Sequence, residues 1–356
     1  MIRREFNRIA FAGLAAAAVA VPGRRAGANE RRIRIGQIGV SHSHAEGKLA
    51  TIQKLGDVFD FAGISEKQAG KKAAARVKPA FRGVKWMSEQ ALLETPGLEA
   101  VLIETDPDDL VETAMKCVSR GLHVHVDKPP GRSLKPLRRL LHSAGEKPVV
   151  VQTGYMFRYN PAFTFCLEVV RKGWLGKVFE VGGIISKAVR EERRPGLTAD
   201  YGGAMMLLGC HLIDMVIAVC GKPDRITGFR RRTHPSKDDL YDNELAVLEY
   251  PGITATVRSS LVEVDGQHRR QFVVCGTEGT LEISPLEPPA VLLSLCEDRG
   301  GYKKGSRQVR FPEMTGRYDD QLLHFAAMIQ GKECNPWSAV HELNVQEALI
   351  QASGRL

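Results

Sequence analysis

The sequence lacks the features of several large classes of protein. The apolar run near the N-terminus has about a dozen residues, fewer than the about 20 that a helix needs to span a bilayer. Basic and aromatic residues do not interleave, as a nucleic-acid-binding groove would require. No repeat or low-complexity segment interrupts the chain. We therefore expect neither a nucleic-acid-binding protein nor a repeat protein.

Cysteines are few and scattered. There are seven, with no C-x-x-C pair and no Cys/His spacing typical of metal ligands. The number is odd, and several lie in apolar stretches typical of a core. This pattern predicts buried free cysteines rather than a disulfide framework or a metal site.

What is present is typical of a globular α/β protein. A chain of 356 residues is too long for one ordinary core, so two domains are expected. The 43% hydrophobic content and 35 glycines agree with this class. Residues 1–28 hold five arginines against one acid and so supply +4 of the formal charge of +9.

Residues 1–28 have the pattern of an export signal peptide. Arg3 and Arg4 stand before an apolar run over 9–21, and small residues at 26–28 offer a cleavage site. The paired arginines resemble the twin-arginine signal, which exports folded proteins. We expect a periplasmic protein with no stable membrane insertion after signal cleavage; the alternative is a membrane anchor formed by an uncleaved signal.

From residue 33 the chain alternates strand, turn and helix, which predicts a parallel sheet covered on both faces. We assign residues 31–152 to a Rossmann NAD(P)-binding domain and 153–356 to a second domain. The predicted strands are 33–40, 59–64, 100–104, 122–126 and 149–152. The predicted helices are 48–55, 68–77, 110–119 and 134–143.

The first turn matches a dinucleotide fingerprint only in part. Gly39 takes the first glycine position of G-x-G-x-x-G, but Ser41 replaces the second. Ser41 and His42 either donate to a phosphate or cap the helix. Glu66 follows the second strand, where a carboxylate accepts from the ribose 2′-hydroxyl and repels a 2′-phosphate. The sequence therefore favours NAD, with NADP as the alternative.

A lysine follows the apolar strand 122–126. Lys128 precedes Pro129 and Pro130, which cannot continue a helix or donate to a sheet, so the chain turns there. The turn puts one amine at the carboxyl edge of the sheet, where open α/β folds bind ligands. This amine can donate to a substrate oxygen or carry a proton. The alternative is a surface lysine in a rigid turn.

Five motifs in order resemble the glucose-fructose oxidoreductase/inositol dehydrogenase (Gfo/Idh/MocA) family, over nearly the whole mature chain. They are Asp127-Lys128-Pro129 for the family's Glu-Lys-Pro, Arg158 with Pro161, the stretch 173–178, the glycines 202 and 203, and Gly209-x-His211-x-x-Asp214. Thr105 also resembles the family's loop beneath the nicotinamide.

The resemblance implies an α+β second domain with an open, mostly antiparallel sheet, helices on one side and an oligomer surface on the other. A homo-oligomer is therefore expected. A late helix over 318–330 is expected to pack back toward the first domain. The strands predicted from alternating polarity are 179–187, 225–231, 244–250, 253–260, 270–275 and 279–283.

The resemblance also implies site residues. Lys128 and His211 would be catalytic: the histidine takes the hydroxyl proton and the lysine steadies the oxygen. The family's aspartate, four residues before the histidine, is Leu207 here. The cofactor-binding residues would be Gly39, Ser41, His42, Glu66, Thr105 and Lys128. The substrate-binding residues would be Tyr155, Arg158 and Asp214, although Asp214 matches a structural aspartate of the family.

No metal is expected. His42, His44, His123 and His125 form a cluster in the sequence, but no carboxylate or cysteine is expected to join them. The leading interpretation is an NAD(P)-dependent oxidoreductase that acts on a sugar or polyol hydroxyl. The alternatives are an NAD-using glycoside hydrolase or lyase that oxidises its sugar transiently, and a non-catalytic sugar-binding relative.

Overall fold

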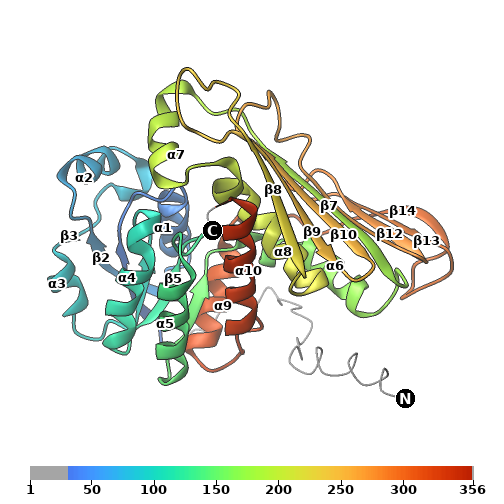
Figure 1. The fold of residues 1–356 in the computed structure, drawn as a ribbon. Coiled ribbons are helices and arrows are strands. Elements are labelled where there is room, and N and C mark those ends of the chain that lie inside the picture. Colours follow the sequence, from blue (N-terminus) through green and yellow to red (C-terminus); the bar gives the residue numbers. More distant parts are fainter. Residues whose placement is uncertain (1–30, 355–356) are drawn as a thin grey trace, which may run out of the picture.

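The computed structural model describes residues 31–354, which fold around two separate sheets (Figure 1). The predicted export signal lies outside the described residues. Within 31–354, none of the helices is long and apolar enough to cross a bilayer.

The first sheet has six parallel strands in the order β3-β2-β1-β4-β5-β6, which is the order of the Rossmann fold. Its strands are Ile33–Ile38 (β1), Phe59–Ser65 (β2), Trp86–Met87 (β3), Ala100–Ile103 (β4), His123–Val126 (β5) and Val151–Thr153 (β6). The five predicted strands lie within two residues of these bounds. The sequence did not predict β3, because two residues are too few to show a periodicity.

The helices beside this sheet are Ala45–Lys54 (α1), Ala69–Arg76 (α2), Glu89–Leu93 (α3), Pro107–Ser119 (α4) and Leu134–Gly145 (α5). Helix α1 begins three residues earlier than predicted, directly after the first turn. Helix α4 also begins three residues earlier, at Pro107, because a proline fits the first helical position without losing a hydrogen bond.

The second sheet has eight strands in the order β14-β13-β12-β11-β7-β10-β9-β8. They are Val178–Ser186 (β7), Arg225–Arg231 (β8), Asn243–Tyr250 (β9), Ile253–Ser260 (β10), Gln271–Gly276 (β11), Gly279–Ile283 (β12), Val291–Leu295 (β13) and Gly305–Val309 (β14). Only β7 and β10 pair in parallel. The predicted fold class, a Rossmann domain followed by a mostly antiparallel open sheet, is confirmed; β13 and β14 extend that sheet beyond the prediction.

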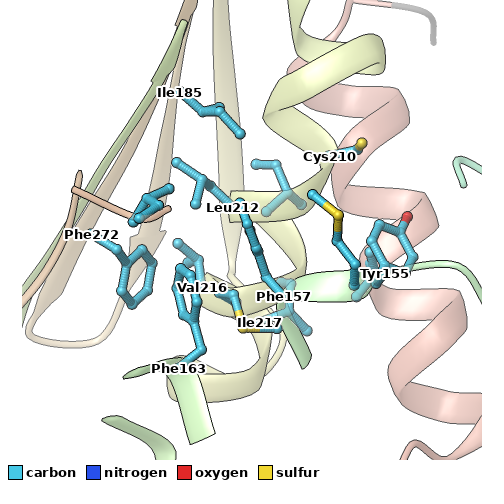
Figure 2. Close-up of a cluster of buried hydrophobic side chains, with 14 of the residues drawn as sticks. Tyr155, Phe157, Phe163, Ile185, Cys210, Leu212, Val216, Ile217 and Phe272 are labelled. Carbon is cyan, nitrogen blue, oxygen red and sulfur yellow. The ribbon is translucent and has the colours of Figure 1, made fainter. Parts of the chain in front are cut away.

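One face of the second sheet packs on helices. These are Pro161–Arg171 (α6) and Cys210–Cys220 (α8), which follows a π-helical turn over Met205–Gly209. The short helix Arg194–Asp200 (α7) contributes Leu197 and Asp200 to the lining of the cleft described below. Figure 2 shows Phe163, Leu212 and Phe272 gathered between α8 and the sheet. The Phe163 and Phe272 ring centroids are 5.2 Å apart. This core fixes α8, and therefore His211 in its first turn, against the sheet.

Helices Asp319–Ile329 (α9) and Ala339–Ala352 (α10) lie between the two sheets (Figure 1). The Gln152 side-chain amide on β6 donates to the Gln321 carbonyl of α9 at 3.1 Å. The Gln346 amide on α10 donates to the Gly131 carbonyl at 2.9 Å. Helix α9 lies where the late helix was expected, whereas α10 was not predicted.

All seven cysteines are free. Cys117, Cys166 and Cys210 are buried, as predicted. Cys296 and Cys334 are exposed, so for these two the interpretation as core residues was wrong.

Candidate active site

The turn after β1 brings two loops into contact. Gly39 has φ +91°, and a Cβ there would lie 2.6 Å from both the Glu104 carbonyl carbon and the Thr105 nitrogen. Only glycine permits this approach. The Ser41 and His42 amides donate to the Glu104 carbonyl at 3.0 and 3.1 Å. The carboxyl ends of β1 and β4 therefore form one surface, where a Rossmann fold binds its dinucleotide.

Glu66 lies beside this turn, at the end of β2. Its carboxylate accepts from the Val40 amide at 3.2 Å and from the Gln68 amide at 2.8 Å. The neighbouring Lys67 pairs with Asp109 at 2.7 Å and does not pair with Glu66. The residues therefore fit NAD: a glycine at the close approach, and a fixed carboxylate at the end of β2, where a Rossmann fold receives the adenosine ribose.

A cleft opens between the two domains. Residues of both domains line it: Ser41, His42, Ser43, Thr105, Asp106, Pro107, Lys187, Val189, Arg193, Leu197, Asp200, Tyr201 and Leu207. The structure thus brings Ser41, His42 and Thr105 to one cleft. The His42 side chain is nevertheless buried against protein groups, so its geometry favours a structural role over phosphate binding.

Lys128 is held on both sides of its backbone. Its amide donates to the Asp127 carboxylate at 2.6 Å, and its carbonyl is 3.0 Å from His42 Nε2. Its peptide bond to Pro129 is cis. The buried ammonium donates to the Leu207 carbonyl at 2.9 Å. Among residues 31–354 it forms no ion pair, so the N–H donors that Leu207 does not use remain available for a substrate oxygen.

His211 is buried, and its Nδ1 has no hydrogen-bond partner within the described chain. Burial lowers the pKa of His211 well below its usual value, and Lys128 and His44 add to the effect. The imidazole is therefore neutral at neutral pH and can accept a proton. Leu207, at the position of the family's aspartate, offers its carbonyl to Lys128 but no carboxylate to the histidine.

Behind Lys128 lies a buried ionic cluster that sequence reasoning missed. Lys48 on α1 donates to Asp127 at 2.5 Å and to Glu104 at 3.0 Å. Burial alone would lower the pKa of Lys48, but Asp127 and Glu104 raise it above its usual value. Burial would raise the pKa of Asp127, but His42 and Lys48 hold it well below normal. Burial and the Asp127 charge raise the pKa of Glu104 well above its usual value. The only signal in the sequence was a lysine on the apolar face of a helix.

The expectation that no carboxylate joins the histidines was wrong. A carboxylate does join the histidines: ligand atoms of His42, His44 and Asp127 lie within 4.8 Å of one another. His123 and His125 instead bond to the Val150 amide and the Gln152 side chain. The Lys48 ammonium already lies against Asp127 and supplies the positive charge there. The absence of a metal stays a prediction, and this charge balance supports it.

Of the predicted substrate residues, Arg158 and Asp214 bind each other. Arg158 pairs with Asp214 at 2.7 Å and with Glu342 of α10 at 2.6 Å, and all three are buried. This geometry favours a structural role over substrate binding. Tyr155 differs: its ring lies 6.1 Å from that of His211, and its buried hydroxyl has no partner among the described residues. Tyr155 therefore stays a candidate substrate-binding residue beside His211, one of the two predicted catalytic residues.

Comparison with protein families gives two matches. Residues 33–155 match the model described as "Oxidoreductase family, NAD-binding Rossmann fold" (GFO_IDH_MocA). Residues 164–282 match the GFO/IDH/MocA C-terminal domain. The two models together cover most of the chain and leave only residues 156–163 between them.

Individual relatives are distant in sequence. The chain is 27% identical to the uncharacterized oxidoreductase YhhX of Escherichia coli K12, over 68% of this chain and 69% of the relative. It is 24% identical to scyllo-inositol 2-dehydrogenase (NAD(+)) of Bacillus subtilis 168, over 69% of this chain and 72% of that relative.

Two solved structures share the fold. UDP-N-acetylglucosamine 3-dehydrogenase GnnA from Acidithiobacillus ferrooxidans has a TM-score of 0.73 at 19% identity, covering 92% of this chain and 98% of its own. Levoglucosan dehydrogenase, in complex with NADH and levoglucosan, has a TM-score of 0.73 at 17% identity. The match covers 91% of this chain and 98% of levoglucosan dehydrogenase.

Proposed function

Because the chain belongs to the GFO/IDH/MocA oxidoreductase family and carries its NAD-binding Rossmann domain, we propose that it transfers hydride between a sugar or polyol hydroxyl and a bound nicotinamide. The observation that carries this proposal is a pair of buried side chains. One is a lysine without a carboxylate partner, whose ammonium donates to the carbonyl of the cleft-lining Leu207, and the other is a neutral histidine. Gly39, Ser41, Glu66 and Thr105 would hold the cofactor, which supplies the hydride acceptor or donor.

Lys128 and His211 have different roles toward the substrate hydroxyl. The ammonium donates to the substrate oxygen and stabilises the negative charge that grows as the proton leaves. The neutral imidazole takes that proton. Since no carboxylate pairs with Nδ1 in the described structure, His211 holds the proton less firmly than a carboxylate-paired histidine would.

Hydride transfer is tested on the purified protein. Nucleotide released on denaturation, or saturable NAD binding, is expected, together with net NADH formation from a sugar or polyol. Aryl-glycoside cleavage without net NADH would support the hydrolase alternative instead. No bound nucleotide and no saturable binding would refute the proposal.

Glu66 supports a preference for NAD over NADP. Replacing it by glutamine, which keeps a backbone-accepting oxygen but loses the charge, is expected to weaken NAD binding and strengthen NADP binding. The ratio of the two dissociation constants should shift by about 10-fold or more, which corresponds to a single charge-assisted hydrogen bond. Fluorescence titration measures both constants. Glu94→Gln, on an exposed helix end, is the control, and an unchanged ratio would contradict this role.

Export and assembly are also part of the proposal. The Arg3 and Arg4 pair supports a periplasmic location, which cell fractionation before and after changing both residues to lysine would test. Phe229 and Leu292 are exposed at 46% and 38% on strands of the second sheet. These exposed apolar side chains support a homo-oligomer formed through the sheet. A monomer by light scattering would contradict it.

A further inference from the structure

A second lysine faces the cleft from the other domain. Lys187 directly follows β7 and lines the cleft with Tyr201 and Leu207. Its amide donates to the Ser260 carbonyl at 3.0 Å, so the sheet fixes its backbone. Throughout residues 31–354, the Lys187 ammonium has no hydrogen bond or ion pair. It is half-buried, so this positive charge has lost part of its water without gaining a partner.

The groups that face Lys187 are mostly cations. Burial, followed by the charges of Lys128, Arg193, Arg270 and Arg317, lowers the pKa of Lys187 to about 8. These four cations come from four separate segments: the end of β5, the turn before α7, the residue before β11 and the turn before α9. Positive charge therefore surrounds this side of the cleft.

The acids near these cations are paired with arginine or lysine or, in the case of Asp200, have a raised pKa. Glu287 is shared between Arg317 at 2.8 Å and Arg270 at 3.6 Å. Glu263 pairs with Arg269 at 3.1 Å, and Asp106 pairs with Lys71 at 2.6 Å. Asp200 also lines the cleft, but burial and Asp106 raise its pKa, which disfavours its charged form.

We propose that the substrate of this cleft is an anionic sugar, carrying a carboxylate or a phosphate, and that Lys187 binds the anionic group. The inference rests on the proposed function and adds the class of substrate. Lys187 is placed for this role because Leu207 lines the same cleft and its carbonyl holds the Lys128 ammonium. One lysine would contact the reacting hydroxyl and the other the charged group. A negative group at Lys187 would also relieve the repulsion among the surrounding cations.

The test measures binding by calorimetry, with and without saturating NAD, so that it does not depend on turnover. The probes are D-glucose, D-glucuronate and D-glucose 6-phosphate. In the wild-type chain, one of the two anions is expected to bind at least about tenfold more tightly than glucose. Lys187→Gln is expected to raise the dissociation constant of that anion by about 10- to 100-fold, because the variant removes a charge-assisted hydrogen bond. The dissociation constants of glucose and NAD are expected to stay the same.

Two variants and the pH dependence separate charge from structure. Lys187→Arg should restore most of the anion binding. Lys177 is an exposed lysine directly before the start of β7, so Lys177→Gln should leave the dissociation constants of the anion, glucose and NAD unchanged. In the wild type, the dissociation constant for the anion should be constant between pH about 7 and about 8, where a phosphate monoester keeps its full charge. It should rise above pH about 8 as Lys187 loses its proton, and Lys187→Arg should abolish this rise.

Two outcomes would overturn the inference, and a third would refute only the proposed function. Equal binding of glucose and both anions would show that the cleft does not select charge. A Lys187→Gln variant that loses NAD affinity rather than sugar affinity would assign the lysine to the cofactor. Loss of NAD binding in the wild type would refute the proposed function, whereas the preference for an anion would still be read from the titrations without NAD.

Discussion

Replacing Lys128 by methionine is expected to lower kcat/KM by about 10²- to 10⁴-fold, the usual contribution of one positioned proton donor or acceptor. Methionine fills a similar volume but cannot donate to a substrate oxygen. The Asp127 and His42 contacts to the backbone of residue 128 do not involve the side chain and should remain. The measurement is the rate of NADH formation, with the NAD dissociation constant determined in parallel.

The controls for this variant distinguish chemistry from folding. Lys135→Met changes an exposed lysine of the same domain and should leave the rate unaltered. The melting temperature of Lys128→Met reports the loss of the hydrogen bond to the Leu207 carbonyl. A variant that binds NAD, melts near the wild-type temperature and still turns over at the wild-type rate would contradict the catalytic role.

Replacing Lys48 by methionine should lower the free energy of unfolding by about 3–5 kcal/mol, the usual cost of removing one member of a buried ion pair. The variant would leave Asp127 and Glu104 side by side in the interior without a fixed cation. Urea unfolding at neutral pH measures the loss. Because Asp127 also holds the Lys128 amide, we expect the turnover rate to fall as well.

An exposed ion pair on the surface serves as the control for the buried cluster around Lys48. Lys116 and Glu89 form an ion pair at 2.9 Å whose side chains are 54% and 31% exposed. Lys116→Met should cost at most about 1 kcal/mol, as exposed pairs do. Adding Glu104→Gln to Lys48→Met should recover part of the loss, since one buried carboxylate is then removed. If Lys48→Met costs no more than Lys116→Met, the cluster does not stabilise the fold.

The sequence predicted the parallel sheet well because its strands are short apolar runs bounded by turns. It missed α10 for an identifiable reason. That helix packs between the two sheets and buries Glu342 and Gln346 beside Val345 and Leu349. Polar residues on a buried face blur the periodicity by which an amphipathic helix is recognised.

The candidate site was predictable only where it follows a local pattern. Lys128 stands at a strand end before two prolines, and His211 lies in a family motif. The partners of Asp127 had no such pattern, because Lys48 lies 79 positions away and meets it only in the folded chain. Lys187 was missed because a lysine at the end of an alternating strand resembles any solvated residue. Its significance depends on four cations from other segments.

The contact between Glu342 and the end of β6 also affects when the fold can be completed during synthesis. Thr153 Oγ1 donates to the Glu342 carboxylate at 2.7 Å across 189 positions of sequence, and Arg158 pairs with the same group. Domains generally begin to fold from the N-terminus during synthesis. Until the ribosome has released Glu342, however, Arg158 lacks one of its two carboxylate partners. An export route that accepts only folded proteins would then discriminate finished chains from prematurely terminated ones.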